Sequence, residues 1–271
     1  MSEKISLNSI LFEKETYLRS LIKELGRVVI GYSGGIDSTL MAKISNDELG
    51  QNALVVISDS PSLPKQELND ALKLAEDNVF NLRVIHTKEA EDENYLENSN
   101  NRCFYCKTEL YQELKKIQKE EGYSAIIDGA NYDDLDDYRP GRKAAKDKGV
   151  RSLLLESFFT KKNVRELAEK LGLSNYDKPA AACLSSRFPY GTSITVEKLS
   201  QVEQAEVIIK KYVNGNVRVR FHNEVARVEV DSEEFVTILE NKNKIYSSLQ
   251  EIGFKYIALD IMGFRSGSLN E

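Results

Sequence analysis

A short glycine-rich stretch, Ser33 to Thr39, has the residue types of a phosphate-binding loop. It follows the apolar run Val28-Val29-Ile30, which is typical of a buried strand, and it precedes a helical pattern. The free N–H groups and the positive dipole end at such a helix start attract an anion. Gly34 and Gly35 would let the backbone approach a phosphate closely. The same stretch contributes hydroxyl donors from Ser33, Ser38 and Thr39.

The residue order in this loop excludes two common nucleotide motifs, because it contains neither G-x-x-x-x-G-K-S/T nor G-x-G-x-x-G. The segment from Ser33 to Ser38 instead resembles SGGxDS, the pyrophosphate loop of the PP-loop ATP pyrophosphatases. That resemblance implies cleavage of ATP between its α- and β-phosphates and transfer of AMP to a substrate. An ordinary tight turn with Asp37 or Ser38 as a helix cap is the alternative interpretation.

Three cysteines form a second set of residues that could carry chemistry. Cys103 and Cys106 make a C-x-x-C pair, and Cys183 lies in an irregular segment between Pro179 and Pro189. Three thiolates would leave one corner of a four-iron cluster open, whereas a structural zinc site normally takes four protein ligands. An iron–sulfur cluster, a zinc site, a redox pair and unligated thiols are the competing interpretations.

Composition limits the class of protein. The chain has 271 residues, 41% of them hydrophobic and 30% charged, as is usual for a soluble globular protein. The net charge of −6 argues against a general nucleic-acid surface. The sequence shows no apolar run of the ~20 residues that a membrane span needs and no apolar signal core at its start. We therefore expect a cytoplasmic protein with no membrane partner and, given the odd cysteine count, no disulfide framework.

Apolar runs alternate with helical patterns along the first part of the chain. They predict five strands, at residues 28–30, 53–57, 82–86, 125–131 and 152–155. This alternation indicates an α/β fold with a doubly wound parallel sheet. Ligands bind beyond the carboxyl ends of such strands, which makes Ser58 a candidate adenosine contact, with a plain turn as the alternative. The acidic run 133–137 is either a solvated loop or a Mg²⁺ site.

Two regions depart from this pattern. Residues 88–100 indicate an exposed loop that delivers the cysteine pair, with a helix after it. From about residue 176 the pattern indicates a small α+β unit with an antiparallel sheet. Its expected elements are helices at 196–212 and 233–250, a hairpin of strands at 217–221 and 225–230, and a last strand at 256–260. We therefore predict two domains, a PP-loop domain at 1–175 and a smaller C-terminal α+β domain at 176–271.

Longer segments across nearly the whole chain resemble the LarE family, whose members are ATP-dependent sulfur transferases of nickel-pincer nucleotide biosynthesis for lactate racemase. The segments that carry this resemblance are SGGIDST at 33–39, RCFYCK at 102–107, DGANYDD at 128–134, YRPG at 138–141, CLSSRFPYGT at 183–192 and RVRFH at 218–222. Similar proteins either sacrifice one cysteine sulfur or carry a sulfide on a three-cysteine 4Fe-4S cluster. The Cys103/Cys106 pair indicates the second kind.

The resemblance implies a PP-loop, HUP-like fold and a small-molecule nucleotide substrate, pyridinium-3,5-biscarboxylic acid mononucleotide. ATP bound at Ser33–Thr39, aided by Mg²⁺, would adenylate a carboxylate of this substrate, and a sulfide donor would reload the cluster. We expect Cys183 and Asp37 to be the catalytic residues, with Asp37 serving loop structure or metal rather than acting as a base. Cys103, Cys106 and Cys183 would hold the 4Fe-4S cluster.

Arginines complete the predicted site. Arg218 and Arg220 alternate on one strand face and suit bidentate capture of the substrate phosphate, although a solvated strand face is the alternative. Arg187, near Cys183, suits a phosphate or a carboxylate. Competing functions are a PP-loop tRNA-uridine thiolase, an amide-forming ligase of the NAD-synthetase kind and a zinc-stabilised ATP-binding protein. We also expect a homo-oligomer.

Overall fold

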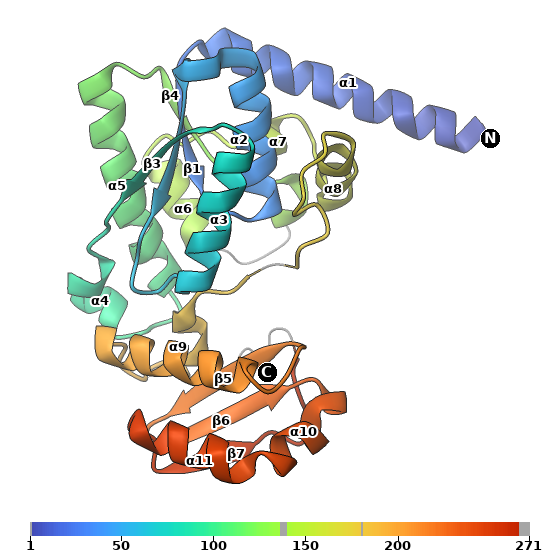
Figure 1. The fold of residues 1–271 in the computed structure, drawn as a ribbon. Coiled ribbons are helices and arrows are strands. Elements are labelled where there is room, and N and C mark those ends of the chain that lie inside the picture. The colour runs from blue at the N-terminus through green and yellow to red at the C-terminus, as the bar shows by residue number, and fades with distance from the viewer. Residues whose placement is uncertain (1, 136–139, 180, 266–271) are drawn as a thin grey trace. The chain divides into compact units, whose positions relative to one another are not determined.

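The computed structural model describes residues 2–135, 140–179 and 181–265 of the chain. These residues form two compact units (Figure 1). The first unit comprises Met1–Ser60, Lys65–Glu89 and Cys103–Ala181. The second unit comprises Pro61–Pro64, Ala90–Arg102 and Ala182–Glu271.

A parallel four-stranded sheet is the centre of the first unit, with the strand order β3-β2-β1-β4. Its strands are β1 (Val28–Tyr32), β2 (Ala53–Ser58), β3 (Asn81–Ile85) and β4 (Ala125–Ile127). Strand β1 is central, and Val28 is in register with Ala53 of β2 and Ala125 of β4. Its residues are almost wholly buried, as a parallel sheet covered on both faces requires. The sequence-based prediction of a doubly wound parallel sheet is therefore confirmed.

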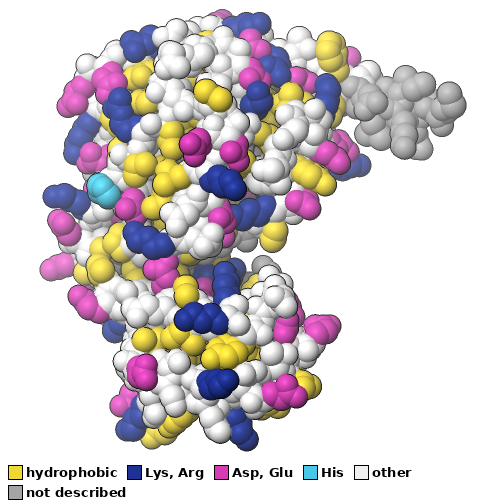
Figure 2. All heavy atoms as spheres, viewed as in Figure 1, with side chains coloured by type: hydrophobic (Ala, Val, Ile, Leu, Met, Phe, Trp, Pro, Cys, Tyr) yellow, Lys and Arg dark blue, Asp and Glu magenta, His cyan; other side chains and the backbone are white. Residues whose placement is uncertain are grey.

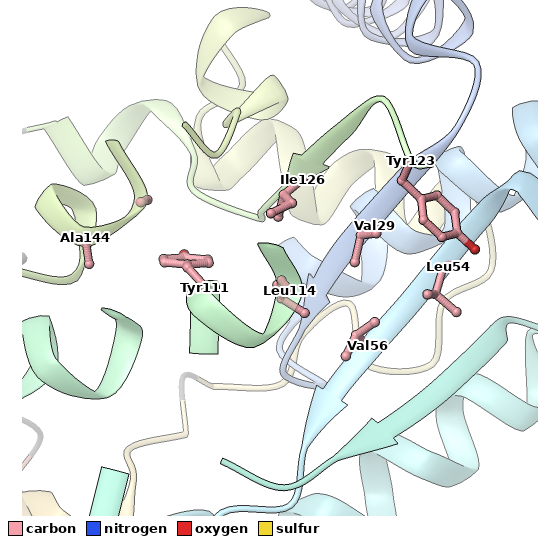
Figure 3. Packing of buried hydrophobic residues seen from close by; sticks show 9 residues of the cluster. Val29, Leu54, Val56, Tyr111, Leu114, Tyr123, Ile126 and Ala144 are labelled. Atoms are coloured by element: carbon pink, nitrogen blue, oxygen red, sulfur yellow. The ribbon is translucent and has the colours of Figure 1, made fainter. Parts of the chain in front are cut away.

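Helices cover both faces of this sheet (Figure 1). The helices of this unit are α1 (Ser2–Leu25), α2 (Ile36–Leu49), α3 (Lys65–Asp77), α5 (Arg102–Glu121), α6 (Pro140–Asp147), α7 (Leu153–Glu156) and α8 (Lys161–Lys170). On one face, Tyr111 and Leu114 of α5 pack against Val29 and Ile126 of the sheet (Figure 3). On the other, the Tyr32 hydroxyl donates to the carbonyl of Ala71 in α3 at 3.1 Å. Truncating a wholly buried core residue such as Leu114 to Ala would cost about 2–5 kcal/mol.

Three details in the first part of the chain differ from the sequence-based prediction. The expected fifth strand at 152–155 is helix α7, and only Arg151 bridges β4, in parallel with Ile127. The error arose because a short leucine run buries itself equally well in a helix or a strand. Cys103 and Cys106 lie inside α5 rather than ahead of it. The expected loop at 88–100 contains two short helices, Glu89–Glu91 and α4 (Glu93–Leu96).

A three-stranded sheet of order β5-β6-β7 is the centre of the second unit. Its strands are β5 (Val217–His222), β6 (Val225–Val230) and β7 (Tyr256–Leu259), and its larger helices are α9 (Val196–Lys210), α10 (Phe235–Glu240) and α11 (Lys242–Glu251). The expected hairpin is confirmed, since His222 pairs with Val225 across a turn in which Asn223 takes φ +56°.

Two details of this second sheet correct the prediction. Strand β7 runs parallel to β6, so the sheet is mixed rather than antiparallel. The reason is the helical crossover between the two strands, which returns the chain to the same end before β7 begins. The helix expected at 233–250 is two helices, which meet at Asn241.

Acidic and basic side chains alternate over the described part of the face that Figure 2 shows, where they form no continuous basic surface. None of the helices that the structure describes is long and apolar enough to cross a membrane.

Candidate active site

The loop after β1 is held in one conformation by close packing and by its own hydroxyl groups. Gly34 has φ +71°, and a Cβ there would lie 2.6 Å from the Cβ of Ala71 in α3. The hydroxyls of Ser38 and Thr39 each donate to the carbonyl of Gly35 at 2.9 Å. Gly35 occupies the N-cap position of α2 and has no side chain to cap the helix. Because Gly35 offers no side-chain cap, the N–H groups of the first turn of α2 are suited to bind an anion.

The Asp37 carboxylate lies in the first turn of α2, between two partners from other elements. The amide of Asn131, which follows β4, donates to Asp37 Oδ1 at 3.0 Å. The ammonium of Lys161, at the start of α8, bonds Asp37 Oδ2. This cation beside the glycine-rich loop was missed from the sequence. Its one local signal is the helix start, where Thr160 and Asn163 form a capping box.

Asn175 is a second residue that sequence reasoning missed. It is 7% exposed, and its amide donates to the carbonyl of Gly34 at 3.0 Å and to the hydroxyl of Thr39 at 3.1 Å. Gly129, after β4, approaches α2 so closely that a Cβ would lie 2.7 Å from the nitrogen of Ser38. Asn175, near the end of the first unit, and Gly129, after β4, thus restrict the conformation of the loop between β1 and α2.

Ser58 ends β2 at the carboxyl edge of the sheet, where an adenosine contact was expected. Its hydroxyl lies 2.6 Å from the hydroxyl of Thr87, which follows β3. Nearby, Asp59 pairs with Lys65 at 2.7 Å, and His86 lies 3.7 Å from Asp59. These polar groups lie at or after the carboxyl ends of β2 and β3, which are neighbouring strands. Open α/β sheets bind their ligands beyond the carboxyl ends of the strands.

The turn after β4 organises the other side of this edge. Asp128 accepts hydrogen bonds from the hydroxyls of Tyr111 at 3.0 Å and Ser152 at 2.7 Å. Burial and the adjacent Asp128 carboxylate raise the pKa of Tyr111 well above its usual value, so this hydroxyl stays protonated. The carboxylates of Asp133 and Asp134 accept from the backbone N–H groups of Lys161 and Asn131. The rest of the acidic run, residues 136 and 137, and the first two residues of the YRPG segment lie outside the described residues.

The cysteines are divided between the two units. Cys103 is exposed and Cys106 half-buried, and they are spaced i, i+3 in α5, so their side chains share one helix face. Cys183 is half-buried and belongs to the second unit, where it precedes the 3₁₀ helix Leu184–Arg187. Within the described ranges, no group of three or more His, Cys, Asp or Glu side chains is placed to hold a metal ion.

Arg187 and Arg220 of the second unit are engaged in buried ion pairs. Arg187 is 2% exposed, makes a two-pronged contact with Glu206 at 2.9 and 3.0 Å, and donates to the carbonyl of Cys183 at 2.9 Å. Arg220 pairs with the wholly buried Glu229 at 3.0 Å and donates to the carbonyl of Ser186 at 2.8 Å. Both guanidinium groups therefore hold the segment that follows Cys183.

Arg218 differs from these two arginines. Its guanidinium donates to the carbonyl of Val217 at 3.2 Å and lies 5.3 Å from the ring centroid of Phe264. In the part of the chain that the structure describes, no carboxylate forms an ion pair with it. Desolvation and the nearby Arg187 lower the pKa of Arg218, although it stays charged at neutral pH.

A parallel sheet with a glycine-rich loop between its central strand and the following helix defines the class, a PP-loop ATP pyrophosphatase fold. In agreement, the family model described as NAD synthase matches residues 10–107. An uncharacterised protein of Synechocystis is 44% identical over 96% of this chain and 98% of its own length. The pyridinium-3,5-bisthiocarboxylic acid mononucleotide synthase of Lactiplantibacillus plantarum is 39% identical over 96% of this chain and 95% of its own length. The chain belongs to the LarE family of enzymes.

Proposed function

We propose that this enzyme is an ATP-dependent sulfur transferase that converts a carboxylate of pyridinium-3,5-biscarboxylic acid mononucleotide into a thiocarboxylate. The observation that carries the proposal is the uncapped start of α2, with Asp37 held between Asn131 and Lys161. The similarity to a bisthiocarboxylic acid mononucleotide synthase over almost the full length supports the substrate class.

ATP activation is the first step of this proposal. A carboxylate resists substitution because its oxygen is a poor leaving group, whereas transfer of AMP creates an acyl-adenylate from which AMP departs readily. The N–H groups at the start of α2 and the hydroxyl of Ser33 would stabilise the departing pyrophosphate, while Ser38 and Thr39 hold this ATP-binding loop in place through the carbonyl of Gly35. Lys161 adds a cation there, and Asp37 offers a carboxylate to Mg²⁺. Pyrophosphate and AMP are the expected products, and Ser58 would contact the adenosine.

The sulfur source is the second part of the proposal. Cys103 and Cys106 share one face of α5, as two ligands of one cluster must, and Cys183 is the third candidate ligand. A 4Fe-4S cluster held by three cysteines would supply a sulfide at the iron that no cysteine ligates. The chain's own contribution is to fix the ligand segments, since Arg187 binds the carbonyl of Cys183 and Tyr111 ties α5 to Asp128.

Substrate recognition falls to cations of the second unit. A mononucleotide carries a phosphate, and the guanidinium of Arg218 forms no ion pair with a carboxylate among the described residues. Arg220 and Arg187 form ion pairs with Glu229 and Glu206, and they would shape the site around Arg218.

The test is an anaerobic assay with the bis-carboxylate mononucleotide, ATP, Mg²⁺ and sulfide, read by mass spectrometry of the thiocarboxylate and by release of pyrophosphate. Purified protein should be brown and absorb near the ~400 nm expected of cluster-bound thiolates. Cys183→Ala should abolish sulfur transfer and leave ATP-dependent pyrophosphate release measurable. Colourless protein with stoichiometric zinc, or full turnover by Cys183→Ala, would contradict the proposal.

A further inference from the structure

Phe264 lies after the last strand, outside every motif that the proposed site uses. Its ring centroid is 5.3 Å from the guanidinium carbon of Arg218 on β5. The Phe264 side chain is half-buried, so its ring has structural support without being part of the core. An arginine over an aromatic face is attracted by the ring quadrupole and keeps the N–H groups at its edge directed outward.

The chain reaches this position through a turn that only glycine suits. Gly263 has φ +68°, and a Cβ there would lie 2.9 Å from the carbonyl oxygen of Val230. The N–H of Gly263 donates to the carbonyl of Asp260 at 3.0 Å, and the N–H of Phe264 donates to the carbonyl of Val230 at 2.8 Å. The turn is thus fixed on both sides, and it places the Phe264 ring against Arg218.

The carboxylates near Arg218 are paired with other arginines. Glu229 is shared by Arg220 and Arg227, and Glu206 is occupied by Arg187. The ring of Phe264 orients the Arg218 guanidinium but does not neutralise it. Arg218 has the charges of Arg187 and Arg220 as well as those of Glu206 and Glu229 in its surroundings, and neither carboxylate is ion-paired with it among the described residues. A half-buried guanidinium oriented in this way can donate two parallel N–H bonds to a phosphate monoester.

We propose that Phe264, delivered by the Gly263 turn, is the positioning residue that presents Arg218 to the phosphate group of the mononucleotide substrate. The proposal rests on the proposed function for the identity of the substrate. It predicts that Phe264 sets the preference for the mononucleotide over the corresponding nucleoside, which lacks the phosphate.

The test measures binding by calorimetry to the full chain without ATP, with the bis-carboxylate mononucleotide and its dephosphorylated nucleoside as titrants. Phe264→Leu should weaken mononucleotide binding about tenfold, within the range of a partly desolvated cation–π contact, and change nucleoside binding less than twofold. Phe264→Tyr should restore binding. Gly263→Ala, which keeps the ring but displaces it, should reproduce the Phe264→Leu defect.

Tyr256→Leu is the matched control, because Tyr256 is an exposed ring of the same unit that contacts a different cation, Lys255. Mononucleotide binding by Phe264→Leu within twofold of wild type, or an equal loss for the nucleoside, would overturn the inference. In turnover, KM for the mononucleotide should rise while kcat is kept. If binding depends on Phe264 but the enzyme does not turn over the mononucleotide, only the proposed function is contradicted. If turnover is normal but binding does not depend on Phe264, only this inference is contradicted. If the wild-type protein does not bind the mononucleotide, both are contradicted.

Discussion

The ammonium group of Lys161 is ion-paired with the carboxylate of Asp37, which lies 124 positions earlier in the chain. The pair joins the start of α8 to the first turn of α2, at the loop where ATP is proposed to bind. Asp37 is 22% exposed and Lys161 35% exposed as side chains, so both remain accessible to a ligand. The loop therefore has a cation at its mouth that no residue of the glycine-rich stretch supplies.

Lys161→Ala should lower kcat/KM for ATP by about 10²-fold, because the departing pyrophosphate loses a preorganised positive group. The measurement is ATP-dependent pyrophosphate release at varied ATP concentration. Lys162→Ala is the control, since Lys162 is 72% exposed and pairs with Glu166 on the next turn of α8. Equal activity of the two variants would contradict a role of Lys161 in the activation of ATP.

Gly34→Ala should destabilise the protein more than Gly26→Ala. Both glycines have positive φ, at +71° and +69°, so each alanine incurs about 1–2 kcal/mol of backbone strain. Only at Gly34 does the new Cβ also meet a neighbour, Ala71, at 2.6 Å, whereas nothing lies within 4 Å at Gly26. Urea unfolding of both variants measures the difference, and ATP binding should be weakened only in Gly34→Ala. Equal unfolding free energies would mean that α3 yields without cost.

Glu229→Gln should destabilise the second unit by about 3–5 kcal/mol, because removing one partner leaves the charge of the buried Arg220 uncompensated. The exposed pair of Glu224 and Lys255, 3.5 Å apart, provides the control. Glu224→Gln should change the unfolding free energy by less than about 1 kcal/mol. Chemical unfolding followed by circular dichroism measures both, and similar losses in the two variants would refute this assignment of the buried pair.

His222 should make stability depend on pH. Desolvation and the charges of Arg227 and Arg220 lower the pKa of His222 below the 6.5 of the unfolded chain. The unfolded state therefore binds the proton more tightly, so the contribution of neutral His222 is complete above about pH 6.5 and is lost as the pH falls through the folded-state pKa. The loss of unfolding free energy between pH 7.5 and 5 should be smaller in His222→Gln than in wild type. A loss in His222→Gln equal to that of wild type would contradict this role of His222.

The sequence predicted the sheet and the loop because both depend on local signals. Val28 to Ile30 and the glycines after them define a strand, a turn and a helix start within a dozen residues. Lys161 and Asn175 were missed because their partners, Asp37 and Gly34, are more than a hundred positions away. Nothing local distinguishes either side chain from an ordinary surface lysine or asparagine.

The errors in secondary structure have a common physical origin. The run at 152–155 is apolar but too short to establish a period, so its burial fits a helix as well as a strand. The direction of β7 depends on the crossover through α10 and α11 rather than on its own residues. The assignment of Cys103, Cys106 and Cys183 to one cluster stays a prediction from composition and resemblance.

Cys183 is held by hydrogen bonds to its main-chain carbonyl, which do not involve its thiol. Arg187 and the hydroxyl of Ser186 both bind the Cys183 carbonyl, at 2.9 and 2.7 Å, so the segment is anchored through its main chain. Every residue type has that carbonyl, and the anchor survives whatever side chain stands there. We therefore expect serine, alanine or selenocysteine at position 183 to leave these main-chain hydrogen bonds in place while changing only the chemistry of the side chain.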